Sequence, residues 1–257
     1  MGADEHQLRH QIVEVGRWIY QKGWVAANDG NISARLAEDR LLMTPTGVSK
    51  GMLAPEQLIV TDLHGNKIAG EGACTTELDM HLAIYRLRPD VNAVVHTHAP
   101  VSTGFAAAGR ALDLALLPEA VIGLGCVPLA PYALPGTPEL AQSIEPLVGS
   151  FNALLLANHG VVTYAHTLRR AFFLMETVEH VAKITLVAEL AGGAKALSRR
   201  EVQRLLEARP RYGLDTTAPN LPGCPKAAED LEFDSTPPVS HRQLLSLLED
   251  LVRSQIH

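Results

Sequence analysis

Three histidines in this chain of 257 residues are placed so that their imidazole rings could share one metal ion. His96 and His98 follow the mostly apolar run 91–95, which predicts a buried strand. Residues i and i+2 of a strand point to the same face, so both rings can approach one ion. His159 follows a second apolar run, 153–157, and precedes a glycine. Three neutral imidazoles leave an open position on zinc, as catalytic sites require.

An H-x-H pair is also found at the polar end of ordinary strands, so the pair alone is weak evidence for a metal. The similar setting of His159 strengthens the case. An ion with an open position can act on substrate oxygens as a Lewis acid. His81 lies four residues after Glu77 on a predicted helix, and we interpret it as a packed or solvated residue.

Glu77 is a candidate acid/base residue, although in isolation we would interpret it as an ordinary charge at the start of a helix. We expect it in the first turn of a helix that begins near Thr76, where the helix dipole stabilises a carboxylate. Thr76 with Asp79 approximates a capping box. Thr75 and Thr76 offer hydroxyl groups and free N–H groups, which is how helix starts bind phosphate.

Two turns could supply further donors to an anion. They lie at Gly30-Asn31 and at Thr46-Gly47, in polar stretches that contain glycine. Ordinary hairpin turns explain either stretch equally well, so neither alone identifies a binding site.

The elements that must position these residues alternate between helices and strands. Helical periodicity predicts helices over 5–22, from about 76 to Pro89, over 138–148 and over 167–190. Apolar runs predict strands at 41–43, 58–62, 91–95 and 153–157, the last continued by 161–163. The segment 114–131 alternates apolar runs with glycines and prolines, which indicates short strands with turns.

Composition limits the class of protein. The length and the 47% hydrophobic residues suit one large α/β domain or two small ones. A formal net charge of −6 argues against a nucleic-acid-binding protein, and the longest apolar runs are too short for a membrane span. The N-terminus is too polar for a signal peptide. Three scattered cysteines form no disulfide pattern, so we expect a reduced, cytoplasmic protein.

The sequence changes character after Tyr212. Residues 214–238 contain five prolines and several acids. We therefore expect a catalytic domain over 1–213, a Pro-rich linker over 214–239, and a C-terminal helix over 240–257 that Ser240 could cap.

Taken together, the motifs resemble the class II aldolase/adducin family, and within it the L-fuculose-1-phosphate aldolases, over roughly residues 5–212. The matching pieces, in the family's order, are Gly30-Asn31-Ile32-Ser33, Thr44-Pro45-Thr46-Gly47, Thr75-Thr76-Glu77, His96-Thr97-His98, Ala130-Pro131-Tyr132 with Gly136-Thr137, and Asn158-His159-Gly160. Each piece is weak, whereas the joint match is strong.

The resemblance implies a fold and a set of roles. The fold is α/β, a central and mainly antiparallel sheet flanked by helices on both faces. His96, His98 and His159 match the ligands of one divalent metal ion, zinc or else manganese, iron or cobalt. Glu77 matches the acid/base, which can also approach the metal as a fourth ligand. The phosphate-binding positions match Asn31, Thr46, Gly47, Thr75 and Thr76. The family typically forms homotetramers with active sites between neighbouring subunits.

The chain departs from the fuculose-phosphate pattern at one place. A tyrosine from a neighbouring subunit protonates the leaving group there, and we place Glu119 near the corresponding position. A carboxylic acid can do the same work if burial raises its pKa, or it can mark a different substrate.

The implied activity is metal-dependent cleavage of a phosphorylated ketose, similar to L-fuculose 1-phosphate, to dihydroxyacetone phosphate and an aldehyde through an enediolate. The same chemistry serves decarboxylases of keto acids or hydroxylated aromatic acids, and sugar-phosphate epimerases and dehydratases. A non-catalytic adducin-like module is a third possibility. Such modules lack the metal ligands, whereas this chain carries all three histidines and the glutamate.

Overall fold

The computed structural model describes residues 5–212 and 224–231, and it contains one sheet of eight strands in the order β4-β3-β2-β1-β5-β8-β7-β6. Neighbouring strands are antiparallel except for β6 and β7, which are parallel. The strands are β1 (Asn31–Ala37), β2 (Arg40–Met43), β3 (Ile59–Asp62), β4 (Lys67–Ala69), β5 (Ala93–Thr97), β6 (Leu129–Ala130), β7 (Ala153–Leu156) and β8 (Gly160–Ala165). The mainly antiparallel sheet is the one that the family resemblance implies.

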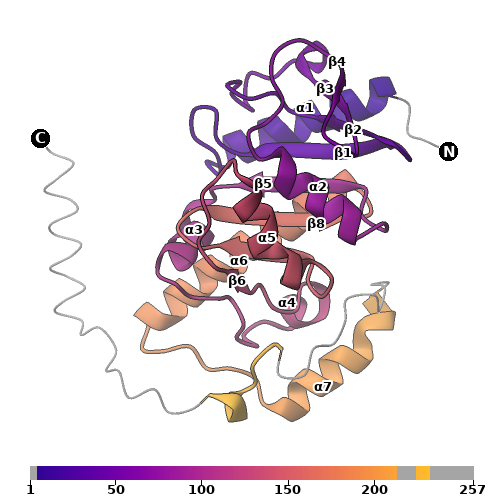
Figure 1. The fold of residues 1–257 in the computed structure, drawn as a ribbon. Helices are drawn as coiled ribbons and strands as arrows, with labels where there is room; N and C mark the ends of the chain where they lie inside the picture. Colours follow the sequence, from indigo (N-terminus) through magenta and orange to yellow (C-terminus); the bar gives the residue numbers. More distant parts are fainter. Residues whose placement is uncertain (1–4, 213–223, 232–257) are drawn as a thin grey trace, which may run out of the picture.

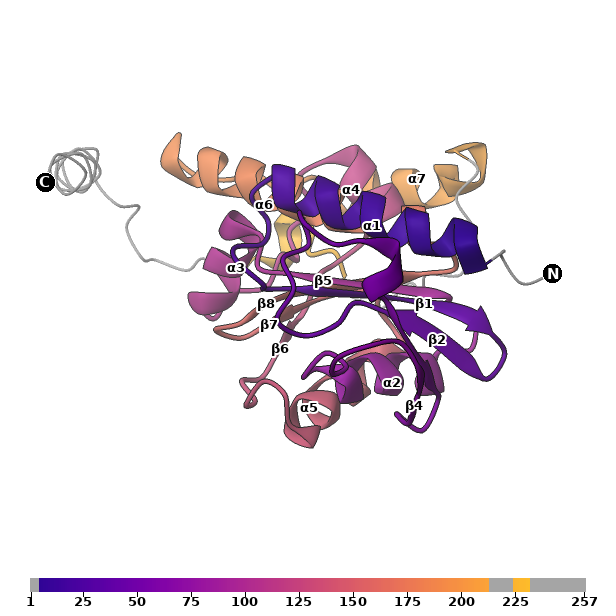
Figure 2. The ribbon, with the colours of Figure 1, turned by 90° about the horizontal axis from the view of Figure 1, so that it is seen from above.

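Helices cover both faces of this sheet, which makes three layers (Figures 1 and 2). Helices α1, α3, α4, α6 and α7 lie on one side, and α2 and α5 lie on the other. Their bounds are α1 (Glu5–Gln21), α2 (Leu78–Leu87), α3 (Pro100–Ala107), α4 (Pro118–Gly123), α5 (Pro138–Val148), α6 (Leu168–Leu190) and α7 (Arg199–Ala208). No helix in the described ranges is long and apolar enough to cross a membrane.

Alternation along the central strands decides which side chains face which layer. On β5, Val95 belongs to the core beneath α1 and α6, whereas Val94 belongs to the core beneath α2 and α5. His96 has the parity of Val94, so it faces α2. On β1, Asn31 lies directly opposite His96 and points to the same face. Two neighbouring central strands therefore present polar side chains to the start of α2.

Three segments have a secondary structure different from the predicted one. The polar stretch at Asn31 was expected to be a turn, but it begins β1, because pairing with β2 and β5 outweighs its turn composition. Residues 161–163 do not continue the preceding strand; β7 and β8 form an antiparallel hairpin around His159. The segment 114–131 contains helix α4 as well as strand β6.

Helix α2 begins two residues later than expected. Its N-cap is Glu77, and Thr76 forms no capping box. The hydroxyl of Thr75 instead accepts a hydrogen bond from the backbone N–H of Glu77, at 3.3 Å. The carboxylate of Glu77 makes no capping bond to its own helix, so it is available for other contacts.

The residues 224–231 contact the domain closely. Lys226 pairs with Leu114 as an isolated β-bridge, and its ammonium lies 2.9 Å from the carboxylate of Asp113.

A disulfide joins Cys126 to Cys224, so the expectation that all cysteines are unpaired is wrong. The two cysteines are 98 positions apart, so only the fold brings them together. Because two of the three cysteines are paired, the cysteines no longer support the expectation of a reduced, cytoplasmic protein. The expected helix 240–257 and the rest of the linker 214–239 lie outside the described residues.

Candidate metal centre

The structure brings the three predicted histidines together at one end of the sheet. The ring centroids are 5.0 Å apart for His96 and His98, 4.8 Å for His96 and His159, and 5.1 Å for His98 and His159. One nitrogen of each ring lies within 4.8 Å of the other two. Nitrogens bound to one tetrahedral zinc ion lie about 3.4 Å apart. The rings therefore need only small adjustments to share an ion.

Two different elements deliver these rings. His96 is the last residue but one of β5, and His98 follows the strand. Thr97, between them, faces α6 and donates to the sulfur of Met175. His159 lies in the turn between β7 and β8, where Asn158 adopts a φ of 55°. Asparagine tolerates this left-handed conformation better than most residues. The turn carries His159 beside β5 because β8 pairs with β5.

Neighbouring groups orient two of the rings. Nδ1 of His96 donates to the carbonyl oxygen of Val161, at 2.9 Å. This bond fixes the tautomer, so the lone pair is on Nε2, which faces the other rings. The carboxylate of Asp29 lies 3.5 Å from Nδ1 of His98 and can accept a hydrogen bond from it, which would favour the same tautomer in that ring.

Glu77 lies against this cluster. Its Oε2 is 3.2 Å from Nε2 of His96, and its Oε1 is 3.0 Å from Nε2 of His159. The side chain of Glu77 is only 8% exposed. Nδ2 of Asn31 donates to Oε2 at 2.6 Å, whereas Oε1 has no hydrogen-bond donor among the described residues. A predicted acid/base and three predicted ligands thus form one cluster.

The charge state of the cluster fits a bound cation. Burial lowers the pKa of His96 to about 3, so the ring is neutral at physiological pH. Burial also lowers the pKa of His98. Burial alone would raise the pKa of Glu77, but the adjoining imidazoles and the bond from Asn31 lower it, so the carboxylate is ionised. Buried lone pairs of nitrogen and oxygen therefore converge without a matching positive charge, which a divalent metal would supply.

The predicted phosphate contacts fall into two groups. Thr46 and Gly47 are exposed in a turn that lies beside Thr75 and Thr76, because Pro45 forms a β-bridge with Cys74. Gly47 has a φ of 74° and open space around it.

Asn31 differs from the other predicted phosphate contacts. It is buried, and both ends of its amide are hydrogen-bonded within the protein, to Glu77 and to His81.

Glu119 is exposed on α4, on the other side of the sheet from α2. The structure does not bring it to the histidines within one chain. A role for Glu119 would therefore have to be in the site of a neighbouring subunit, as the resemblance implies.

His81 is packed in the interior, which is one of the two interpretations that the sequence allowed, but its contact with Asn31 was not predicted. It is fully buried, and its Nε2 lies 2.5 Å from the side-chain oxygen of Asn31. Burial lowers the pKa of His81 to about 4, against an opposing effect of Glu77, so the ring is neutral. The spacing of four residues from Glu77 was the available signal, because such residues share one face of a helix.

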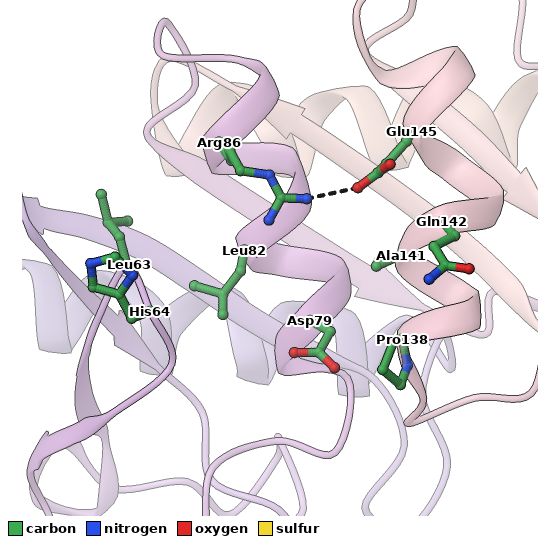
Figure 3. Close-up of a pocket in the computed structure, with 9 residues that line it drawn as sticks. All are labelled: Leu63, His64, Asp79, Leu82, Arg86, Pro138, Ala141, Gln142 and Glu145. Atoms are coloured by element: carbon green, nitrogen blue, oxygen red, sulfur yellow. Dashed lines mark hydrogen bonds and ion pairs between the residues drawn. The ribbon is translucent and has the colours of Figure 1, made fainter.

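A cleft of about 570 Å³ lies between α2 and α5 (Figure 3). Arg86 and Glu145 form an ion pair of 2.7 Å across it. None of the three histidines lines this cleft; its lining residues are Leu63, His64, Asp79, Leu82, Arg86, Pro138, Ala141, Gln142 and Glu145. The cleft and the metal centre are therefore separate features of the same face.

Comparisons with known proteins agree with this geometry. The family model "Class II Aldolase and Adducin N-terminal domain" matches residues 10–186. The chain is 34% identical over 206 residues to a 5-deoxy-D-ribulose 1-phosphate aldolase of Bacillus thuringiensis, covering 80% of this chain and 96% of that protein. It is 35% identical over 188 residues to a 3-oxo-tetronate 4-phosphate decarboxylase of Escherichia coli K12, covering 71% of this chain and 88% of that protein.

A solved structure of an L-fuculose 1-phosphate aldolase superposes with a TM-score of 0.74 and 27% identity, covering 83% of this chain and 99% of that one. Sequence, fold and the cluster of histidines around a buried glutamate all agree. The chain belongs to the class II aldolase and adducin family, as one of its metal-dependent enzymes.

Proposed function

We propose that this enzyme cleaves a phosphorylated ketose reversibly to dihydroxyacetone phosphate and an aldehyde. The observation that carries the proposal is the buried, ionised carboxylate of Glu77, which contacts His96 and His159 and has one oxygen without a hydrogen-bond donor among the described residues. His96, His98 and His159 would hold one divalent ion, with zinc as the first candidate. The ion would supply Lewis-acid stabilisation for negative charge on substrate oxygens.

Glu77 performs the proton transfer in this proposal. In the condensation direction, its carboxylate removes a proton from the hydroxymethyl carbon of dihydroxyacetone phosphate, which leaves an enediolate. In the cleavage direction, Glu119 of a neighbouring subunit would accept the proton of the hydroxyl next to the breaking bond, the carbon–carbon bond breaks, and the carbon that bears this hydroxyl becomes the aldehyde. The electron pair stays on the other fragment as the enediolate, and Glu77, which must first take up a proton from solvent, gives that proton to carbon. Its ionised resting state suits the role of base.

The substrate phosphate is proposed to bind where the Thr46-Gly47 turn meets the start of α2. Thr76, Thr46 and Gly47 are exposed there, and hydroxyl and backbone N–H groups are the usual donors to phosphate. The names of the two aldolase relatives support a phosphorylated substrate.

Decarboxylation of a phosphorylated 3-oxo acid is the second candidate, and the 35% identity to a 3-oxo-tetronate 4-phosphate decarboxylase favours it. The bond to the carboxylate breaks, carbon dioxide leaves, and the electron pair again remains as an enediolate. Glu77 could return the proton to carbon in this reaction as well. The two reactions therefore make the same demand on Glu77 and differ in the group that leaves.

Assembly into a homotetramer, with Glu119 contributed to a neighbour's site, is part of the proposal. Substitution of Glu119 by Gln tests it. A large fall in the rate of aldehyde release, with intact proton exchange on dihydroxyacetone phosphate, would support proton transfer by Glu119 at the aldehyde oxygen, as a base in cleavage and as an acid in condensation. Equal rates of release in both proteins would remove Glu119 from the mechanism.

The deciding experiment is a product assay of the metal-loaded protein with phosphorylated ketoses and phosphorylated 3-oxo acids. Aldol cleavage releases dihydroxyacetone phosphate, which a coupled dehydrogenase detects. Decarboxylation of a compound such as 3-oxo-tetronate 4-phosphate would give carbon dioxide and dihydroxyacetone phosphate but no aldehyde, so carbon dioxide without an aldehyde identifies it, and epimerisation keeps the carbon skeleton intact. Chelation should abolish turnover, and a divalent metal should restore it. Turnover that survives complete removal of the metal would contradict the proposal.

A further inference from the structure

A row of buried polar side chains continues inward from Glu77, between α2 and β1. Ser33, His81 and Tyr85 are 0%, 0% and 2% exposed. The oxygen of Ser33 lies 2.6 Å from Nδ1 of His81 and 2.9 Å from the hydroxyl of Tyr85. Nε2 of His81 lies 2.5 Å from Oδ1 of Asn31.

The spacing of the two elements explains how the row forms. On α2, Glu77, His81 and Tyr85 are four residues apart, so they lie along one face of the helix. On β1, Asn31 and Ser33 are two residues apart, so they point to the same side of the sheet. The three side chains of α2 alternate with the two side chains of β1, and together they form one continuous chain of hydrogen bonds.

The carboxylate sets the direction of every bond in this chain. An ionised Glu77 can only accept, so the group of Asn31 that faces it is the NH₂. The oxygen of the same amide then faces His81 and must accept from Nε2–H. A neutral imidazole with its proton on Nε2 accepts at Nδ1, which requires the hydroxyl of Ser33 to donate. The remaining hydroxyl, on Tyr85, donates to the oxygen of Ser33.

Packing alone does not require such a chain. A fully buried row of polar groups is favourable only when each member is satisfied, and apolar side chains of similar size fill a core at least as well. What the chain does achieve is a single orientation of the Asn31 amide. That orientation gives Oε2 of Glu77 a hydrogen bond, while Oε1, beside His159, has no donor among the described residues.

We propose that His81, held by Ser33 and Tyr85, is a positioning residue that fixes the Asn31 amide and so makes Oε1 of Glu77 the oxygen that transfers the proton. Asn31 is accordingly assigned to Glu77, to which one N–H of its amide is committed. The assignment rests on the proton-transfer role proposed for Glu77.

The tautomer of His81 is the direct test. Two-bond ¹H–¹⁵N correlation spectra of the full chain, labelled with ¹⁵N-histidine and loaded with Zn²⁺, report which ring nitrogen carries the proton. Loss of the signal in His81→Gln assigns it. We expect a neutral ring protonated at Nε2 from pH 6 to pH 8. A ring protonated at Nδ1, or a charged ring, would overturn the direction of the chain. This measurement requires no turnover, so it remains decisive if the proposed aldolase activity is not found.

Kinetics test the consequence. The rate of proton exchange on dihydroxyacetone phosphate should fall about tenfold or more in His81→Leu, with little change in KM, because a displaced base lowers kcat and not ground-state binding. His81→Gln keeps one donor and one acceptor and should recover part of the rate. Ser33→Ala removes only a distant donor and should cost less than His81→Leu.

Thr163→Val is the matched control. Its hydroxyl is also buried in the sheet and donates to the carbonyl oxygen of Ala171, but on the α6 face. It should lose stability and keep the exchange rate. Wild-type kcat in a folded Ser33→Ala or His81→Leu protein would contradict the positioning role, as would equal losses in Thr163→Val. If His81→Leu does not fold, Ser33→Ala and the tautomer measurement decide.

Discussion

Gly160 lies so close to Thr97 that a Cβ atom on the glycine would come 2.5 Å from the threonine's carbonyl oxygen. The same atom would come 2.7 Å from Cδ2 of His98 and 3.1 Å from Cε1 of His96. These distances are too short for any side chain, so the backbone of β8 can approach β5 only through a glycine. The close approach is what brings His159, the residue before it, up to the other two rings.

Gly160→Ala should therefore weaken metal binding by about tenfold or more, because the added methyl group displaces two coordinating rings. A competition titration with a chromogenic zinc chelator measures the change. Gly149→Ala is the control, since a Cβ at Gly149 meets nothing within 4 Å and its φ of −64° suits alanine. Equal affinity in both variants would show that the histidines do not bind the ion as assigned.

Glu77→Gln should retain the metal and lose proton exchange. The amide is similar in size to the carboxylate but cannot accept a proton, and removal of a general base lowers the rate by about 10²- to 10⁴-fold. Solvent deuterium incorporation into dihydroxyacetone phosphate measures the exchange, and elemental analysis measures the metal. Glu56→Gln, an exposed residue next to α1, is the control. Exchange at the wild-type rate would remove Glu77 from its assigned role.

Lys50 gives a prediction about pH. Its ammonium is buried, donates to the carbonyl oxygens of Asn28 and Val48, and so ties together the two loops beside the site. Burial lowers its pKa to about 8, against the opposing charges of Asp29 and Glu77.

Between pH 8 and its ordinary pKa of 10.5, Lys50 is therefore protonated more in the unfolded chain than in the folded one. The unfolded state then binds more protons, so this residue's contribution to stability increases as pH rises and is unchanged below pH 8. The free energy of unfolding of wild type minus that of Lys50→Met should increase by about 2 kcal/mol between pH 7 and pH 9.5. Urea titrations at the two pH values check it; a constant or falling difference would contradict the burial effect.

Glu179 connects α6 to the start of α3, just after His98. Its carboxylate accepts from the backbone N–H groups of Val101 and Ser102 and from the Ser102 hydroxyl, and it is 1% exposed. Glu179→Ala would leave buried donors unsatisfied and should lower the free energy of unfolding by about 2 kcal/mol or more.

Glu176→Ala, on the same helix, is the comparison for Glu179→Ala. Glu176 forms a largely exposed ion pair with Lys22, so its loss should change stability by less than about 1 kcal/mol. Urea titrations compare the two variants with wild type. Similar losses in both would contradict the capping role of Glu179.

Much of the site could be predicted because it follows from local periodicity. The spacing of His96 and His98 on a strand implies a shared face, and the structure places both rings together. The positions of Asn31 and His81 could not be predicted in this way. Asn31 lies in a stretch with turn composition, and only its pairing with β5 makes it part of a strand. The bond between Asn31 and His81 spans 50 positions, so it depends on the packing of α2 against β1 and not on local pattern.

The pairing of β5 with β8 joins segments that are more than 60 positions apart, and two of the proposed ligands lie on one side of that pair and the third on the other. An ion bound by all three histidines would bind the folded chain and not the unfolded one, so its binding would increase the free energy of unfolding. At a free ion concentration of a thousand times its dissociation constant, such linkage adds about 4 kcal/mol. Amide hydrogen exchange in β5 and β8 should therefore slow most when metal is added. The stability of the centre of the sheet would then depend on the concentration of free metal.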